Sequence, residues 1–462
     1  MVMHAVAEAT MLIRQGSLTA RDLVEQCLDA IEVHNPELNA FVHVDAEGAR
    51  RAADAVDAAV KAGEPLGPLA GVPFGVKDLE DCAGMPTTKG SRWYAGGPPA
   101  RRDDIHVERL RAAGAIPIGK TASPEFGTWA YTASPALGVT RNPWDPTRTP
   151  GGSSGGSAAA VSAGMVPFCT ASDGGGSIRT PAGFTGLVGL KPCYGRIPTY
   201  GVTHLSQNAV VGALSTTVSG HAMLLDVMSG PDRRDRTCLP APPVRYVDAA
   251  QRLDVTGLRA AWSLDLGFAV VDPEVATITE QAARALAEAA GLLWVERPVH
   301  FDDYILTYVH MEGADMFVGV DPVMWQERLD ELDPLVAPGW ASAQHVTLPQ
   351  FAAVYDERAR IEQQVAELFA DIDVLFTPMA SIPAFPAEGP MPTEVAGVQG
   401  HGGMAVMFAM LANLTNLPAI SVPAGITAGG LPVGLQVVGD RFREDVCLRL
   451  ARIAEDVLRW PR

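Results

Sequence analysis

The spacing of apolar residues along the chain changes at about residue 65. Before that point apolar side chains over residues 23–31 recur at helical intervals after Thr19, a typical helix N-cap with Asp22 three positions on. A second, alanine-rich stretch over residues 46–61 precedes Gly63, a residue typical of helix ends. The pattern therefore predicts N-terminal helices that pack on a core.

Beyond residue 65, short apolar runs lie between helical stretches and turns rich in Gly and Pro. Each run has the length of a buried strand, and the runs cover residues 72–76, 115–118, 166–170, 374–377, 420–423 and 434–438. Alternating strands and helices are typical of an α/β sheet covered by helices on both faces. Residues 229–255 are expected to form a surface connection, and residues 383–403 a long loop.

Composition narrows the class of protein. The chain has 462 residues, a formal net charge of −18 and 47% hydrophobic residues, which excludes a sequence-independent nucleic-acid binder and a disordered chain. The six cysteines are scattered, the N-terminus lacks a basic segment, and no stretch of 18 residues is wholly apolar. We therefore expect a cytoplasmic protein that contacts neither nucleic acid nor membrane.

Two motifs match known sequence patterns but lack the structural context that each pattern requires. Residues 114–121 match the P-loop, but the segment between its glycines reads as a strand and contains Pro117, which has no N–H to offer a phosphate. Residues 151–155 match the nucleophile elbow of α/β-hydrolases, but the Pro-rich segment before them is not a central strand. Because the sequence also has no metal-ligand spacing and no dinucleotide fingerprint, we expect no cofactor and no metal.

Two Gly-rich turns carry serines 24 residues apart, Ser153 and Ser177. Glycines at Gly174, Gly175 and Gly176 allow consecutive backbone N–H groups to point at one position, as in an oxyanion hole. A flexible linker fits this segment poorly because it also carries Asp173, Ile178 and Arg179. The pattern favours a serine-based catalytic site.

Lys77 ends an apolar run that precedes these turns. A lysine at the end of a strand usually extends to solvent. Burial would instead lower its pKa and make a neutral amine available as a base that activates a serine. Arginine could not replace it, since a guanidinium does not deprotonate, and the chain contains only five lysines.

Together these motifs resemble the amidase signature family of serine hydrolases. The resemblance rests on the two serine turns, on Lys77, and on motifs at residues 119–126, 141–144, 186–196, 413–423 and 430–436. It implies a single domain with a large mixed central β-sheet: N-terminal helices over 1–65, a catalytic core over 66–230, a variable substrate-cleft region over 240–365 and a C-terminal core over 370–455. Residues 240–365 match no motif of the family.

The resemblance also implies the role of each residue. Ser177 is the expected nucleophile, Ser153 the serine that relays its proton, and Lys77 the neutral base. The peptide bond before Ser153 is expected to be cis. Backbone N–H groups of Gly174, Gly175, Gly176 and Ser177 would stabilise the oxyanion, Ser154 would support the reacting hydroxyls, and Asp173 and Arg179 would orient the turn.

Two departures from the family concern the oxyanion turn and the substrate pocket. Gly174 stands where Thr or Ile is usual, and residues 127–131 carry two large aromatic side chains. Trp129 and Tyr131 are either core residues or part of an acyl pocket that favours bulky substrates. The expected pocket residues are Phe126, Gly127, Thr128, Trp129 and Tyr131.

The resemblance leaves the substrate open. The middle of the chain is apolar, with Met311, Met316, Phe317, Met324, Trp325 and Trp340, which suits a hydrophobic cleft or a plain core. The glycine-rich turn is similar to that of broad-specificity amidases, including nylon-oligomer and urethane hydrolases, so we expect a monomeric or homodimeric enzyme acting on small hydrophobic or aryl amides, carbamates or amide oligomers. The alternatives are the A subunit of glutamyl-tRNA amidotransferase and an inactive interaction protein. Residues 194–201 and the chain length are similar to those of the A subunit.

Overall fold

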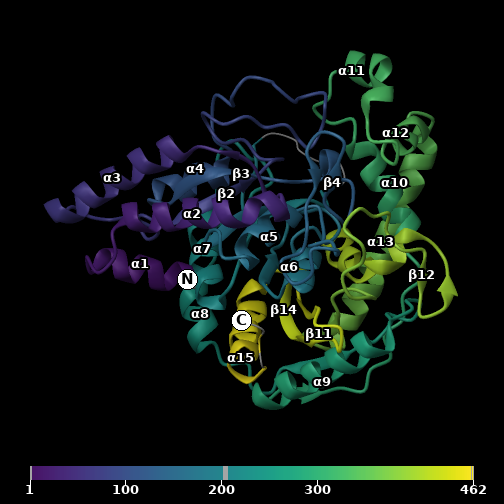
Figure 1. Cartoon of the computed structure of the whole chain (residues 1–462). Helices are drawn as coiled ribbons and strands as arrows, with labels where there is room; N and C mark the ends of the chain where they lie inside the picture. Colours follow the sequence, from purple (N-terminus) through teal and green to yellow (C-terminus); the bar gives the residue numbers. More distant parts are fainter. Residues whose placement is uncertain (1–2, 201–206, 459, 461–462) are drawn as a thin grey trace.

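The computed structural model describes residues 3–200, 207–458 and 460. Its centre is a mixed sheet of eleven strands in the order β1-β3-β2-β6-β8-β7-β14-β15-β11-β9-β10, covered by helices on both faces (Figure 1). These strands are β1 (Phe41–Val44), β2 (Pro73–Lys77), β3 (Ile116–Thr121), β6 (Phe168–Asp173), β7 (Val188–Lys191), β8 (Val210–Ser215), β9 (Arg259–Trp262), β10 (Leu293–Trp294), β11 (Val374–Pro378), β14 (Ala419–Ile426) and β15 (Pro432–Gly439). The prediction of a single α/β domain with a large mixed sheet is confirmed.

The helices and two small hairpins complete the fold. The helices up to residue 228 are α1 (Val6–Arg14), α2 (Ala20–Leu38), α3 (Ala46–Ala62), α4 (Ile105–Ala112), α5 (Gly155–Ser162), α6 (Arg179–Thr185) and α7 (Val218–Met228). Those after it are α8 (Tyr246–Arg252), α9 (Pro273–Ala289), α10 (Ile305–Asp315), α11 (Pro322–Glu327), α12 (Ala337–Ala343), α13 (Leu348–Asp371), α14 (Met410–Leu414) and α15 (Glu444–Val457). Short 3-10 turns cover Glu125–Gly127, Leu329–Glu331, Gly402–Ala405 and Met407–Ala409, and the hairpins pair β4 (Ala133–Ser134) with β5 (Gly138–Val139) and β12 (Glu394–Val395) with β13 (Val398–Gln399).

Strand direction brings distant parts of the chain to one edge of the sheet. β2 pairs in parallel with both β3 and β6, whereas β6, β8, β7, β14, β15 and β11 follow one another antiparallel. Because parallel strands end at the same edge, the last residue of β2, Lys77, lies near the end of β6, where Asp173 begins the second Gly-rich turn. Two segments about a hundred residues apart therefore meet at the sheet edge.

The predicted elements correspond closely to the observed ones. The Thr19 hydroxyl accepts a hydrogen bond from the Asp22 N–H at the start of α2, and α3 ends at Gly63 with φ +69°. All six predicted apolar runs overlap strands. The predicted loops contain additional elements: α8 falls within residues 229–255, where Tyr246 is buried, and β12 and β13 fall within residues 383–403.

One buried core runs beneath the N-terminal helices, the sheet and α15, and a second lies between β11, α13 and α14. No helix in the described ranges has the length and apolar character needed to span a bilayer.

A buried carboxylate attaches the C-terminal helix to the middle of the chain. Glu444, the first residue of α15, accepts hydrogen bonds from the Cys193 N–H and the Arg196 Nε, each at 3.1 Å. Glu444 is fully buried and Arg196 is 5% exposed. A buried charge that loses its partner is left uncompensated in a medium of low dielectric constant.

We predict that Glu444→Gln lowers the free energy of unfolding by about 3–5 kcal/mol, because it leaves the buried Arg196 without its counter-charge. Urea unfolding of the purified protein measures the change. The control is Glu280→Gln, which removes an exposed pair with Arg284 on α9 and is expected to cost less than about 1 kcal/mol. Equal effects of the two variants would contradict the assignment.

Candidate active site

Lys77 is fully buried and surrounded by serine hydroxyls. Its Nζ lies 2.9 Å from Ser153 Oγ, 2.8 Å from Ser154 Oγ and 2.9 Å from Ser172 Oγ. Its backbone N–H donates to the Thr170 hydroxyl of the neighbouring β6 at 3.0 Å. The lysine therefore does not reach solvent, and its amine is directed at the two serine turns.

Burial lowers the pKa of Lys77 to about 7, although the carboxylates of Glu80 and Asp173 act in the opposite direction. An ammonium group loses its hydration when it is buried, so the neutral amine is favoured. Near neutral pH a substantial fraction of Lys77 is thus neutral and able to accept a proton from a hydroxyl. This is the property that a general base requires.

The loop that carries Ser153 is tightly enclosed. The peptide bond between Gly152 and Ser153 is cis, as the family resemblance implies. A Cβ on Gly152 would lie 2.6 Å from backbone atoms of Trp129 and Tyr131, and one on Gly127 would lie 3.1 Å from Ser153 Oγ. Only glycine fits at these two positions, so backbone packing fixes the Ser153 side chain next to Lys77. No strand directly precedes this loop among the described residues, in contrast to a nucleophile elbow.

The second turn presents Ser177. Asp173 Oδ1 accepts from the Gly176 N–H at 2.7 Å and Asp173 Oδ2 from the Ile178 N–H at 3.1 Å. The Ser177 carbonyl accepts from the Ser154 N–H at 3.3 Å, which joins the two turns. Ser177 is half-buried, and its hydroxyl has no hydrogen-bond partner among the described residues, so it is open to an incoming carbonyl.

The Gly176 amide differs from the expectation for an oxyanion donor. The resemblance places it among the donors with Gly174 and Gly175, but its N–H is already directed at Asp173 Oδ1. Within the described ranges the N–H groups of Gly174, Gly175 and Ser177 have no hydrogen-bond acceptor. Gly176, with φ +125°, instead shapes the turn, and a Cβ there would lie 2.5 Å from the Ala409 side chain.

Arg179 holds this turn against the C-terminal half of the chain. It is fully buried and donates to Asp173 at 2.9 Å, to Asn413 Oδ1 at 2.6 Å and to Gln436 Oε1 at 2.7 Å. Burial alone would raise the pKa of Asp173, but the Arg179 guanidinium holds it well below its usual range. Asp173 and Arg179 therefore lie where they can orient the turn. Asn413, which the sequence presents only as part of a family motif, also contacts Asp173.

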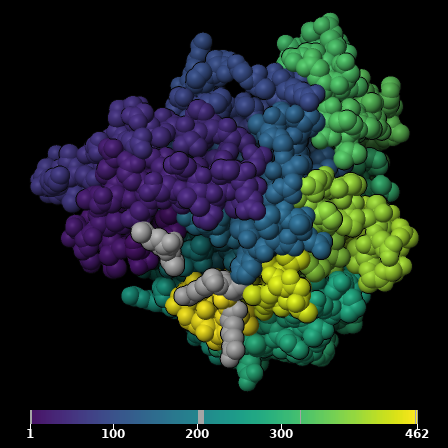
Figure 2. Space-filling view, viewed as in Figure 1, coloured from purple at the N-terminus to yellow at the C-terminus, as the bar shows by residue number. Residues whose placement is uncertain are grey.

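The expected pocket residues differ in burial and in the residues that they contact. Phe126 is half-buried within an aromatic cluster of Trp93, Tyr94, Phe126, Phe317 and Trp340, and it precedes Gly127, which contacts Ser153. Trp129 is half-buried beside this cluster, whereas Tyr131 is 2% exposed and packs on Phe385. Thr128 donates to the Glu125 carbonyl. Figure 2 shows the green surface after residue 300 beside the blue surface around residue 100, the part of the chain that supplies the rest of the cluster.

The structure adds site residues that the sequence does not indicate. Ser172, the third hydroxyl on Lys77, lies on β6 just before the second serine turn, and the family resemblance implies no role for it. Tyr308 and Glu312 come from α10, in the region without family motifs. A Cβ on Gly175 would meet the Tyr308 ring, and one on Gly174 would lie 3.6 Å from Glu312 Oε2. Burial raises the pKa of Tyr308 well above its ordinary value, so its hydroxyl remains a donor. The Trp325 side chain and residue 201 lie outside the described part of the chain.

Other candidate chemistries find no support. The P-loop-like segment is strand β3, and Lys120 Nζ is buried and donates to the Glu80 carbonyl and the Thr87 hydroxyl. In the described ranges, no three His, Cys, Asp or Glu side chains are grouped to hold a metal ion.

Comparison with known proteins places the chain in a family. A family model described as Amidase matches residues 22–448. The A subunit of glutamyl-tRNA(Gln) amidotransferase from Synechococcus sp. (strain CC9605) is 38% identical over 469 residues, covering 95% of this chain and 93% of the relative. The acylamidase of Rhodococcus erythropolis is 34% identical over 458 residues, covering 99% and 96%.

A solved structure agrees with these relatives. A bacterial aryl acylamidase of the amidase signature family superimposes with a TM-score of 0.90 at 27% identity, over 99% of this chain and 97% of that one. Family model, relatives and fold are consistent: this chain belongs to the amidase family of hydrolases that cleave amide bonds.

Proposed function

We propose that the chain is a stand-alone amidase that cleaves small hydrophobic or aryl amides through an acyl-enzyme formed on Ser177. The observation that carries this proposal is the buried Lys77 amine, which lies within 2.9 Å of the Ser153, Ser154 and Ser172 hydroxyls and has a pKa of about 7. A neutral amine directed at hydroxyl groups is suited to accept a serine proton.

The proposed reaction begins when Ser177 Oγ attacks the amide carbonyl. Its proton passes to Ser153 while the Ser153 proton passes to Lys77 Nζ. The N–H groups of Gly174, Gly175 and Ser177 stabilise the oxyanion, each by about 3 kcal/mol. Lys77 then returns the proton through Ser153 to the departing amine. Water attacks the acyl-enzyme by the same relay, which leaves Ser177 and Lys77 as they began.

The substrate class is proposed from the surroundings of Ser153. Gly127 lies beside Ser153, since a Cβ there would be 3.1 Å from Ser153 Oγ, and it follows Phe126, whose ring packs against Trp93 and Trp340. An aromatic wall favours an aryl or apolar group. Carbamates and amide oligomers present the same carbonyl, so they belong to the proposed range. We place residues 240–365 in the role of a cleft wall, since α10 and the segment after it supply Tyr308, Phe317 and Trp340.

We further propose that the enzyme is cytoplasmic, that it binds neither nucleic acid nor membrane, and that it is a monomer or a homodimer. The net charge of −18 supports the absence of nucleic-acid and membrane binding, since both surfaces are themselves negatively charged.

A second candidate function is that of the A subunit in glutamyl-tRNA amidotransferase, which the 38% identity to that protein favours. Such a role requires a pocket for the small polar amide of glutamine, whereas aromatic rings adjoin Gly127 in this chain. A panel of anilides, primary amides including glutamine, esters and carbamates separates the two functions. Turnover of glutamine alone would favour the second.

The first prediction concerns the nucleophile. A fluorophosphonate probe is expected to label the wild-type protein at Ser177, and Ser177→Ala is expected to abolish labelling and lower kcat by about 10⁴-fold, because the attacking oxygen is lost. Mass spectrometry and amine release measure the two effects. Ser17→Ala, at an exposed position in the turn before α2, is the control and should behave as wild type. An unlabelled wild type that hydrolyses no amide would indicate an inactive interaction protein.

The second prediction concerns pH. Because burial lowers the pKa of Lys77 to about 7, the amine is protonated below that pH and cannot act as a base. The kcat/KM for an anilide should therefore rise about tenfold per pH unit below pH 7 and level off above it. Stopped assays between pH 5 and 9 provide the profile. A flat profile, or full activity of Lys77→Ala at pH 7, would remove Lys77 from the mechanism.

The third prediction concerns the aromatic wall. Phe126→Leu is expected to lower kcat/KM for an anilide about 5–10-fold more than for acetamide, because an aromatic contact is worth about 1 kcal/mol. Phe351→Leu is the matched control, since that ring packs on Tyr355 of the same helix, α13. An equal loss for both substrates would show that Phe126 acts on the fold rather than on substrate choice.

A further inference from the structure

Three buried acid–base pairs lie around Lys77, and each carboxylate has its own cation. The pairs are Asp78 with Lys120 at 3.8 Å, Glu80 with His106 at 3.0 Å, and Asp173 with Arg179 at 2.9 Å. All six residues are at most 3% exposed. A lysine among unpaired buried carboxylates would be held in its charged form. The pairing therefore bears directly on whether Lys77 can be neutral.

The Glu80–His106 pair differs from the other two in how its carboxylate is held. Asp78 also accepts from the Thr88 and Gly90 N–H groups, and Asp173 from Gly176 and Ile178. Glu80 Oε2 is bonded to His106 Nε2, while Glu80 Oε1 and His106 Nδ1 have no hydrogen-bond partner in the described ranges. The Thr170 hydroxyl also lowers the pKa of Glu80, but His106 is the larger cause, so the charge of Glu80 depends chiefly on His106.

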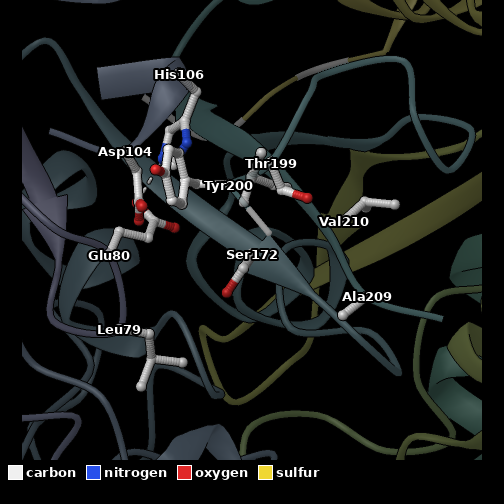
Figure 3. Close-up of a pocket in the computed structure, with 10 residues that line it drawn as sticks. Leu79, Glu80, Asp104, His106, Ser172, Thr199, Tyr200, Ala209 and Val210 are labelled. Atoms are coloured by element: carbon white, nitrogen blue, oxygen red, sulfur yellow. Dashed lines mark hydrogen bonds and ion pairs between the residues drawn. The ribbon is translucent and has the colours of Figure 1, made fainter. Parts of the chain in front are cut away.

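A cavity of about 120 Å³ connects this pair with the surroundings of Lys77. Glu80, His106 and Ser172 all line it, and Ser172 Oγ contacts Lys77 Nζ at 2.9 Å. Figure 3 shows Glu80, Asp104 and His106 gathered at one end of the cavity and Ser172 further along its wall. The carboxylate of Glu80 acts electrostatically on Lys77 and favours the protonated amine.

Of the three cations, histidine alone has an ordinary pKa close to neutrality. Burial by itself would lower the pKa of His106, but Glu80, Asp104 and Asp103 raise it above the ordinary value. Burial would likewise raise the pKa of Glu80, yet His106 keeps it lowered. Both shifts favour an imidazolium paired with a carboxylate, so the positive charge of His106 offsets the negative charge that Glu80 presents to Lys77.

We propose that His106 is the counter-ion that keeps Lys77 available as a base, because it cancels the Glu80 carboxylate that would otherwise hold a proton on Lys77. Glu80 and His106 are positioning residues: they act through Lys77 and touch no substrate. The inference rests on the proposed role of Lys77 in the reaction.

The other charged groups near the pair have partners of their own. Asp103, from the loop before α4, pairs with Arg111, and the Asp104 carboxylate accepts from the Asp81 N–H. Lys120 of β3 pairs with Asp78, and Asp173 of β6 with Arg179. Burial raises the pKa of the Cys169 thiol on β6, which keeps it neutral. The cavity wall from β8 and the residue before it is apolar, with Ala209, Val210 and Val211.

The test is the titration of Lys77 itself in three variants, His106→Asn, Glu80→Gln and the double variant. The chain has only five lysines, so ¹³Cε-lysine NMR resolves each, and Lys77→Arg assigns the signal. His106→Asn should raise the titration midpoint of Lys77 by about 1 pH unit, because Glu80 is left uncompensated. Glu80→Gln should lower this midpoint. In the double variant, whose two amides preserve the hydrogen bond, the Lys77 midpoint should be no higher than in the wild type.

A kinetic readout accompanies the titration. The acidic limb of the kcat/KM profile should move with the Lys77 midpoint, to higher pH in His106→Asn and to lower pH in Glu80→Gln. His221→Asn is the control, since His221 is equally buried but bonds to Ser215, and it should leave the limb in place. If the pair only stabilises the fold, the variants would lower the unfolding midpoint but shift neither the titration midpoint of Lys77 nor the acidic limb of kcat/KM. Such a result would overturn the inference.

The NMR titration separates this inference from the proposed function, since it needs no turnover. If no amide is hydrolysed but the Lys77 midpoints shift in opposite directions, the charge relation holds and the proposed reaction fails. If amides are hydrolysed and the midpoints do not shift, the proposed reaction holds and the role of His106 is wrong.

Discussion

The site depends on a lysine amine that is both buried and neutral. Removing Lys77 from water lowers its pKa to about 7, but Glu80 and Asp173 both favour the ammonium form. A site that simply buried a lysine among carboxylates would form an ion pair and lose its base. Here Arg179 is bonded to Asp173, and His106 to Glu80, so the amine can be shared among three serine hydroxyls instead.

The sheet supplies the geometry that this arrangement requires. Lys77 and Asp173 end strands β2 and β6, which are neighbours and parallel, so the base and the nucleophile turn meet at one edge. Arg179 then links that turn to Asn413 and Gln436 in the C-terminal half. Residues more than two hundred positions apart thereby fix one loop. The Amidase family model likewise spans both halves, since it matches residues 22–448.

Much of this could be predicted from the sequence because the signals are local. The Thr19 cap, the Gly63 stop and the apolar runs depend on a few adjacent residues, and the structure confirms them. Lys77, Ser153 and Ser177 could be singled out because the motifs that contain them resemble those of the amidase signature family. The structure brings Lys77 and Ser153 together and joins Ser177 to them through the Ser154 N–H.

The rest is non-local and leaves little trace in the sequence. His106 lies in an ordinary helix 26 positions from Glu80, and nothing in either segment indicates that they pair. Tyr308 and Glu312 come from a region without family motifs, and their position against the glycine turn depends on how α10 packs. The glycine run alone predicts a Gly176 amide that faces the substrate, but the Asp173 carboxylate folds back over the turn and accepts that N–H.

The most direct test of a neutral, buried Lys77 as the base is a single-turnover measurement of acyl transfer to Ser177 as a function of pH. An excess of enzyme is mixed with a nitroanilide, and mass spectrometry follows the acyl adduct while absorbance follows the released amine. We expect an adduct on Ser177 whose rate of formation rises with pH through a midpoint near 7, the pKa of Lys77. Amine release without an adduct on Ser177, or a rate of acylation independent of pH between about 5 and 9, would contradict this role of Lys77.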